Sequence, residues 1–216
     1  MLSASELNLP QAHQEIAVYA ERVQRMFGMV ADLLHEKEGS EAYLKLYNRI
    51  EKYEQICDRM ELEIAGFLNL VVGGRLSYEG KMMVNSMLTI VTEIESIGDC
   101  CYNLARTLQR KQDSHIDFND EIVSNIDAMF KLDSEALSNI LSSNEPLMSE
   151  IMISYNKECE INNYRNQLRG ANVENINNKH YEYQSGIYYM DMISECERLG
   201  DYVINVVDAI KQQQVK

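Results

Sequence analysis

The sequence predicts an all-α protein made of two tandem antiparallel three-helix bundles. The 216 residues include only two Pro and ten Gly, whereas an all-β protein needs a turn every ~8–12 residues. Six long stretches carry apolar side chains at the spacing of an α-helix. A segment near the end of the first half also recurs near the end of the second half, which indicates a duplicated unit.

The first half is predicted to hold three helices, at about 10–35, 41–72 and 77–111. Pro10 suits the first turn of a helix, the polar residues 35–40 end the first helix, and two glycines at 73–74 end the second. The residues expected to face the core are Ile16, Val23, Met26, Val30, Leu33 and Leu34, then Leu46, Ile50, Tyr53, Cys57, Met60, Ile64, Phe67 and Val71, then Met83, Met87, Ile90, Ile94, Ile97, Cys101, Leu104 and Leu108.

A polar stretch at 112–119 interrupts the helical pattern and marks the expected boundary between the two halves. The first three-helix bundle is assigned to residues 9–112 and the second to 119–213. Helices are predicted at about 120–142, 146–170 and 181–212, with a polar loop at 171–179. Amphipathic helices joined by short loops favour antiparallel packing within each bundle.

The duplicated segment reads TEIESIGDCCYN at residues 92–103 and SECERLGDYVIN at 194–205. Two Glu, the Gly, the Asp and the Asn recur in register, and helical patterning alone does not require such identities. A glycine inside a helix costs ~1 kcal/mol relative to alanine. Its presence at both Gly98 and Gly200 therefore predicts a close approach of another helix at each position.

The charge balance narrows the class of partner. Acidic residues outnumber basic ones by 34 to 20, and the net charge is −14. Phosphate backbones and anionic membranes attract clusters of Lys and Arg, and no such cluster occurs, so neither nucleic acid nor a membrane surface is an expected partner. No apolar run approaches the ~20 residues that span a bilayer, and no signal peptide is recognisable.

The five cysteines are Cys57, Cys100, Cys101, Cys159 and Cys196. Their number is odd, no Cys-x-x-Cys occurs, and four of them fall within apolar helical patterns. We expect reduced, packed thiols, and therefore a cytoplasmic protein.

The repeated acidic residues are predicted to point away from the core. At ~100° per residue, Glu95 lies about 140° and Asp99 about 180° from the centre of the apolar stripe of their helix. Glu197 and Asp201 have the same relation to theirs. Carboxylates four residues apart are neighbours on one helix face, where they repel by only ~0.2–0.5 kcal/mol. A solvated acidic face is therefore one open interpretation.

A metal site on the bundle surface is the other interpretation. Glu54 and Asp58 are also four residues apart, on the preceding helix, and could meet Glu95 and Asp99. In the second half Glu158 has the matching position, with Asn162 four residues later. Two acidic pairs brought together on adjacent helices repel more strongly, and a cation would relieve that cost. Hard oxygen ligands suit Mg, Ca, Mn or Fe, and Zn is also compatible.

Catalytic motifs are lacking. A buried di-iron centre of the ferritin type needs two Glu-x-x-His motifs, and none of the four His has Glu three residues before it. There is no P-loop, Gly-x-Ser-x-Gly or His-Glu-x-x-His, and no nucleophile with a base beside it. We expect a protein that is not an enzyme, and a metal-dependent hydrolase is the weakest of the hypotheses.

The two copies of Glu-x-Glu-x-x-Gly-Asp-x-x-x-Asn resemble the PhoU family, as do EQICDRMELEI at 54–64 and ISECERLGDYVIN at 193–205. The resemblance runs from about residue 9 to 210. It is greatest to the PhoU-like cytoplasmic domain that follows the membrane part of bacterial sodium/phosphate cotransporters, and LPQA at 9–12 looks like the junction of such a domain.

The resemblance implies two three-helix bundles, a regulatory role in phosphate uptake, and metal clusters on the bundle surface that contain divalent or ferric ions such as Fe, Zn, Mg or Mn. The ligands carried over from the family are Glu54, Asp58, Glu95 and Asp99 in the first half, and Glu158, Glu197 and Asp201 in the second. Asn162 stands where the family has an acid, which weakens the second site.

Partners and location also follow from the resemblance. The partner would be the membrane domain of a transporter, in cis if this chain is a fragment, or a signalling protein, and a homodimer is compatible with the sequence. The expected location is the cytoplasm, at the inner face of the membrane if a membrane part precedes residue 1. The alternative is a purely structural or adapter helical bundle with a solvated acidic stripe and no metal.

Overall fold

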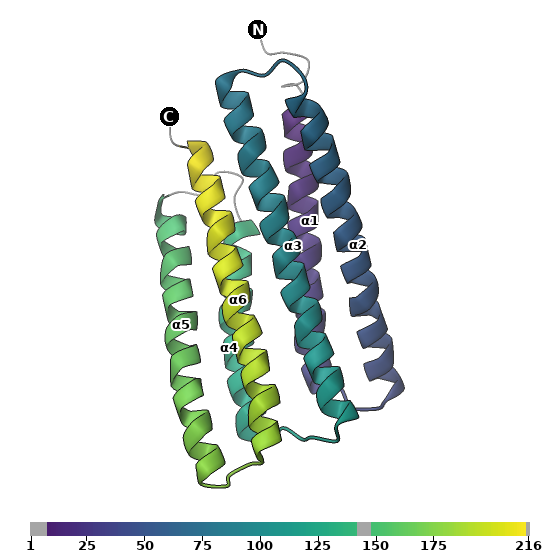
Figure 1. Ribbon diagram of the computed structural model, residues 1–216, viewed down its shortest axis with the longest axis vertical. Coiled ribbons are helices and arrows are strands. Elements are labelled where there is room, and N and C mark those ends of the chain that lie inside the picture. Colours follow the sequence, from purple (N-terminus) through teal and green to yellow (C-terminus); the bar gives the residue numbers. More distant parts are fainter. Residues whose placement is uncertain (1–7, 142–147, 215–216) are drawn as a thin grey trace.

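The structure is a computed structural model that describes residues 8–141 and 148–214. Its helices are α1 (Leu9–His35), α2 (Glu41–Val72), α3 (Tyr78–Asp113), α4 (Asp120–Leu141), α5 (Met148–Asn177) and α6 (Tyr183–Gln214), as Figure 1 shows. The all-α prediction is confirmed. None of the helices in the described ranges is both long enough and apolar enough to span a bilayer.

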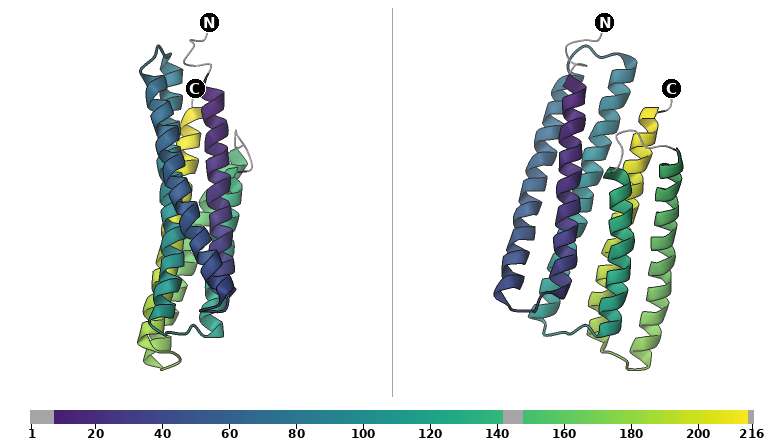
Figure 2. Two further views of the ribbon diagram at one scale, coloured as in Figure 1. Left: turned by 90° about the vertical axis from the view of Figure 1, so that its right-hand side faces the viewer. Right: turned by 180° about the vertical axis from the view of Figure 1, so that it is seen from behind.

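The helices form two antiparallel three-helix bundles, α1–α3 and α4–α6, that lie side by side (Figure 2). α3 and α6, the two helices with the duplicated segment, run antiparallel and pack against each other along the junction. α1 and α4 also meet there, and Phe27 and Phe130 contact edge to face with ring centroids 5.3 Å apart. The bundles therefore share one continuous core.

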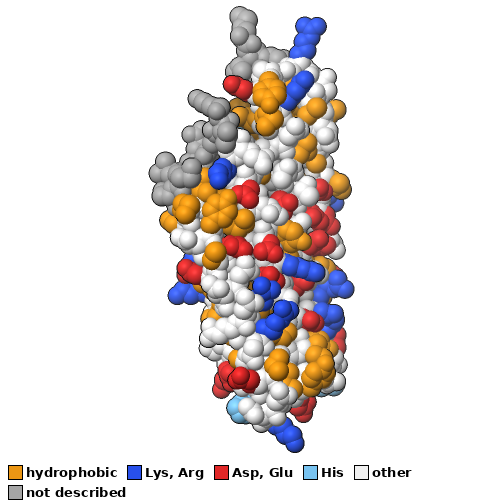
Figure 3. Space-filling view, turned by 60° about the vertical axis from the view of Figure 1, so that its left-hand side comes forward, with side chains coloured by type: hydrophobic (Ala, Val, Ile, Leu, Met, Phe, Trp, Pro, Cys, Tyr) orange, Lys and Arg blue, Asp and Glu red, His pale blue; other side chains and the backbone are white. Residues whose placement is uncertain are grey.

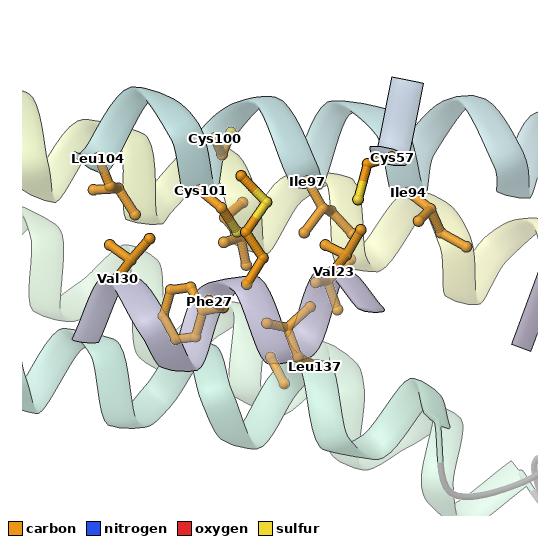
Figure 4. Packing of buried hydrophobic residues seen from close by; sticks show 14 of the residues in the cluster. Val23, Phe27, Val30, Cys57, Ile94, Ile97, Cys100, Cys101, Leu104 and Leu137 are labelled. Atoms are coloured by element: carbon orange, nitrogen blue, oxygen red, sulfur yellow. The ribbon is translucent and has the colours of Figure 1, made fainter. Parts of the chain in front are cut away.

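Apolar residues at helical spacing build this core, as predicted. Figure 4 shows its centre, where Val23 and Phe27 of α1 face Ile97 and Cys101 of α3, and Leu137 of α4 closes the other side. All five are almost fully buried. Burial of such side chains stabilises the fold by ~1.5–3 kcal/mol each, which outweighs the weak helix propensity of Val and Cys.

Capping side chains explain several helix starts. Ser40 Oγ accepts a hydrogen bond from the Tyr43 N–H at 3.1 Å, and Ser77 Oγ accepts one from the Gly80 N–H at 3.0 Å. Each satisfies an amide that has no partner within its helix. Asn119 does the same for Ile122 at the start of α4. Free thiols are also as expected, with four cysteines buried and Cys159 exposed.

The predicted loop at 171–179 is wrong, because α5 continues to Asn177. The polar residues of this stretch are held by tertiary contacts that the local pattern does not reveal. Asn172 is buried and its Oδ1 accepts a hydrogen bond from the Tyr181 hydroxyl at 2.7 Å. Asn175 donates to Glu121 of α4 at 3.2 Å. The predicted helix ends at Ser142 and Pro146 lie outside the described residues.

The prediction of close helix approach at both mid-helix glycines is correct only for Gly200. A Cβ at Gly200 would lie 3.2 Å from Ile161 Cδ1, whereas one at Gly98 would meet only Val23 Cγ2, at an ordinary 3.8 Å. The two halves differ at the facing position, because Ile161 precedes Asn162 where the smaller Cys57 precedes Asp58. The motif is therefore repeated more faithfully than the packing around it.

Alanine substitutions at glycines should separate helix propensity from packing. Gly98→Ala is expected to raise the free energy of unfolding by about 0.5–1 kcal/mol, because alanine has a higher helix propensity than glycine and its Cβ would displace no neighbouring atom. Gly186→Ala should lower it by about 1–2 kcal/mol, because its Cβ would lie 2.5 Å from Ile176 Cδ1 and 2.8 Å from Asn172 Oδ1. Urea denaturation of both variants measures the difference, and equal effects would contradict the packing argument.

Candidate metal site

Three carboxylates converge on the outer surface of the first bundle. Glu54 and Asp58 lie one turn apart on α2, and Asp99 faces them from α3. One oxygen from each side chain lies within 4.8 Å of the other two. Asp58 and Asp99 are exposed and Glu54 is half-buried, while Cys57 and Cys100 beside them are buried in the core. The outward orientation predicted for Asp99 is therefore confirmed.

Burial and the repulsion between neighbouring charges raise the pKa of two members of this group, which we call the acidic triad (Glu54, Asp58 and Asp99). Partial burial raises the pKa of Glu54, and the charges of Asp58 and Asp99 raise it further, while Arg106 opposes the shift. Burial and the charge of Asp58 also raise the pKa of Asp99. The neighbouring negative charges therefore make Glu54 and Asp99 harder to ionise, which is the situation that a bound cation relieves.

Glu95 lies beside the triad rather than in it. It is one helical turn before Asp99, and its carboxyl is close enough to interact with Asp99, Glu61 and Asp58. Burial, followed by repulsion from these groups, raises the pKa of Glu95 to about 7. The structure thus brings together three of the four residues predicted for the first site and places the fourth next to them.

The donor set of the triad fits a hard cation. It offers only carboxylate oxygens, the ligand type that Mg²⁺, Ca²⁺ and Mn²⁺ prefer, and its three oxygens are close enough to share one ion. The exposure of Asp58 and Asp99 leaves room for water to complete the coordination sphere. Such an ion would be held on the surface, where it could exchange with solvent.

The residues predicted for the second site do not assemble in this way. Asn162 donates a hydrogen bond from its amide to Glu158, and Glu197 forms a 2.9 Å ion pair with Arg165. Asp201 is exposed on α6. Within the described ranges, no second group of His, Cys, Asp or Glu side chains converges as the triad does.

The predicted ligand sets leave out two residues that shape these surfaces, Glu61, whose position three residues after Asp58 the sequence showed, and Arg165, which was missed. Glu61 adds a negative charge close to Glu95 in the first half, and Arg165 adds a positive charge in the second. The positions of both residues can be recognised in the sequence. Glu61 follows Asp58 by three residues and Arg165 follows Asn162 by three, so the two halves carry opposite charges at the matching position.

Other residues that recur in both copies of the duplicated segment lie at the junction between the bundles. Asn205 of α6 donates a hydrogen bond to Glu93 of α3 at 2.9 Å. On the other side of the junction, Glu195 lies close to Cys100 of α3 and pairs with Arg198 at 3.0 Å. The first Glu of each copy therefore faces the other bundle, and the second Glu and the Asp face away from it.

Comparisons with known proteins agree with this fold. Residues 16–108 match the model of the PhoU domain family. The structure is similar to that of the phosphate transport system regulatory protein PhoU from Streptococcus pneumoniae, with a TM-score of 0.81, 15% sequence identity, and coverage of 98% of this chain and 97% of that one.

A second solved structure gives the same result. PhoU from Pseudomonas aeruginosa matches with a TM-score of 0.76 and 13% identity, over 96% of this chain and 97% of that one. A comparison with curated protein sequences found no match. The architecture is therefore that of a PhoU protein across both bundles, while the sequence match covers only the first.

Proposed function

We propose that this chain, which matches the PhoU domain at residues 16–108 and has the PhoU fold along almost its whole length, is a regulator of phosphate uptake and not an enzyme. The observation that carries the proposal is the match of both bundles to a phosphate transport regulatory protein, with 97% of that protein covered. The described surface adds an open acidic cluster, which suits the binding of a cation better than the turnover of a substrate.

The acidic triad would hold a divalent or ferric ion in this protein. Glu54 and Asp58 of α2 and Asp99 of α3 would supply the ligands, and Glu95 would stand next to them as a further carboxylate. A cation there would cross-link α2 to α3 at the surface and remove the repulsion between their carboxylates. Its role would be to stabilise one arrangement of the first bundle, not to activate a substrate.

The finer proposal is that the chain is the cytoplasmic part of a sodium/phosphate cotransporter, and that it acts on the membrane part of that transporter in cis or on a signalling protein. The basis is the resemblance of the sequence described above, including the residues at 9–12. Reading the gene upstream of residue 1 tests this version directly. A frame that continues into membrane-spanning segments supports it, and a frame without them favours a free-standing regulator.

Phosphate uptake in cells tests the regulatory role. Cells that lack residues 8–214 of the protein should lose the difference in uptake of radiolabelled phosphate between low and high external phosphate, and the intact chain supplied on a plasmid should restore it. If uptake responds to external phosphate equally well with and without these residues, the regulatory proposal is wrong and the structural or adapter bundle becomes the better interpretation.

A further inference from the structure

The two halves of the molecule carry the same acidic framework but different central residues. In the first half the sequence at three positions of α2 is Glu54, Asp58 and Glu61; the matching positions of α5 are Glu158, Asn162 and Arg165. The facing helices are alike, because α3 contributes Glu95 and Asp99 where α6 contributes Glu197 and Asp201. At these five matched positions the two halves therefore differ only in α5, at Asn162 and Arg165.

Arg165 occupies the space between α5 and α6 on this surface. Its Nη1 lies 2.9 Å from Glu197 Oε1, and both side chains are about four-fifths buried, at 21% and 22% exposure. The Arg165 Nε is also buried, so the guanidinium is inserted between the helices rather than extended into solvent. A partly buried pair of this kind is screened less by salt than an exposed one.

Asn162 provides a hydrogen-bond donor on the same surface. Its amide nitrogen donates to Glu158, where the matching Asp58 can only repel Glu54. Glu158 therefore has an uncharged donor and Glu197 a cationic one, while the exposed Arg106 lies near Glu54 in the first half. Figure 3 shows the face over α5 and α6, where basic side chains lie among the acidic ones across the middle of the molecule.

We propose that Arg165 is a built-in substitute for a metal ion in the second bundle, so that only the first bundle responds to cations. The guanidinium cross-links α5 to α6 in the way that an ion at the acidic triad would cross-link α2 to α3. The difference between the two bundles rests on the proposed metal site of the first bundle. The role of Arg165 in the second bundle is measured independently of that site.

The consequence is an asymmetric protein. Both bundles have a surface cross-link between their second and third helices, one permanent and one conditional on the cation. Because α3 and α6 pack against each other, the second bundle provides a fixed support against which the first can change. The donor set of the second bundle thus does not fit the metal cluster that the family resemblance implies there, and Arg165 is the reason.

The test uses the full chain with the triad disabled by Asp58→Asn and Asp99→Asn, so that any remaining cation effect belongs to the second bundle. Mn²⁺ alone is the probe, and binding is followed by the loss of the free Mn²⁺ signal in electron paramagnetic resonance. With Arg165 present, Mn²⁺ should not bind measurably at millimolar concentration. Adding Asn162→Asp and Arg165→Glu should create binding that is at least about tenfold tighter.

Stability supplies the second measurement. In the same background, Arg165→Met should lower the melting temperature by about 2–4 °C, because Glu197 loses its partner, and Arg165→Lys should recover part of the loss. Arg169→Met is the matched control, because Arg169 is exposed one turn later on α5, and it should have no effect. Should Arg165→Met prove unable to fold, the Lys variant and the Mn²⁺ titration still decide the question.

Two results would overturn the inference. One is Mn²⁺ binding by the triad-disabled chain while Arg165 is intact, since the second bundle would then hold a cation in spite of the guanidinium. The other is an Arg165→Met variant as stable as Arg169→Met. Failure of the proposed metal site is a separate observation, namely that the unaltered chain binds no Mn²⁺ while the variants at 162 and 165 behave as expected.

Discussion

Exchanging Asp133 for Val is expected to raise the free energy of unfolding at pH 7 by about 2–4 kcal/mol. Asp133 lies on α4 with 0% of its surface exposed, and neither carboxyl oxygen has a hydrogen-bond partner of good geometry among the described residues. Beside it is the Cys196 thiol of α6, which is only a weak donor. Burial raises the pKa of Asp133 well above its usual range, so the folded protein holds it neutral.

The sign of the pH effect follows from this shift. Between about pH 4 and the raised folded pKa, the unfolded chain has lost the proton that the folded chain retains, so unfolding releases a proton and stability falls as the pH rises. The contribution of Asp133 is fully present below pH 4. Above it, the wild type should lose stability relative to Asp133→Asn by ~1.4 kcal/mol per pH unit until the folded pKa is reached.

Urea denaturation of wild type, Asp133→Asn and Asp133→Val at several pH values between 4 and 8 measures both effects. The Asn variant keeps the size of the side chain and cannot ionise. The difference in the free energy of unfolding between it and the wild type therefore measures the contribution of ionisation at Asp133. A difference that does not change with pH, together with a destabilised Val variant, would mean that the carboxyl has a strong donor within the core.

Asp99→Asn should have opposite effects on stability in the absence and presence of a divalent cation. Without cation, the substitution removes one charge from the acidic triad and should raise the melting temperature by about 1–2 °C. With Mn²⁺ at 100 times its dissociation constant, the wild type should gain about 2.7 kcal/mol. The variant should lose most of this gain, because one of the three oxygens that converge in the triad is replaced by a neutral amide.

Melting temperatures of the wild type and Asp99→Asn, measured after treatment with a chelator and again after addition of Mn²⁺, test this reversal in relative stability. Glu63→Gln is the matched control, because Glu63 is an exposed acid of α2 outside the triad. Equal stabilisation of wild type and Asp99→Asn by Mn²⁺ would place the bound ion elsewhere. A wild type that Mn²⁺ does not stabilise would leave the triad as a solvated acidic surface.

The candidate site was predictable as far as its local geometry goes. Residues four apart on a helix share a face by covalent geometry alone, so the pairing of Glu54 with Asp58 and the outward direction of Asp99 could be derived from spacing. Which pair meets which depends on the packing of α2 against α3. The spacing of Glu158, Glu197 and Asp201 matched that of the first half, and Asn162 was the departure that the sequence showed. The position of Arg165 between α5 and α6 separates the two surfaces further, and spacing did not reveal it.

Asp133 marks the opposite case. It falls within a helix whose pattern permits a polar residue, so its complete burial between α4 and α6 could not be seen from spacing. The extension of α5 to Asn177 was missed for a related reason, since Asn172 and Asn175 are satisfied by Tyr181 and Glu121, which are distant in the chain or across a turn. Local polarity predicted a loop, and tertiary hydrogen bonds made it a helix.

The sequence by itself determined the fold class, the six helices, the core-facing residues and the duplication, because all of these follow from the period of the helix and from the hydrophobic effect acting along a single segment. The tertiary structure decided how the duplicated helices meet. By setting α3 against α6, it turned one Glu of each copy toward the opposite bundle and left the others on the surface. It also placed the Arg165 guanidinium against Glu197 on the acidic surface of the second bundle, because charges interact through space rather than along the chain.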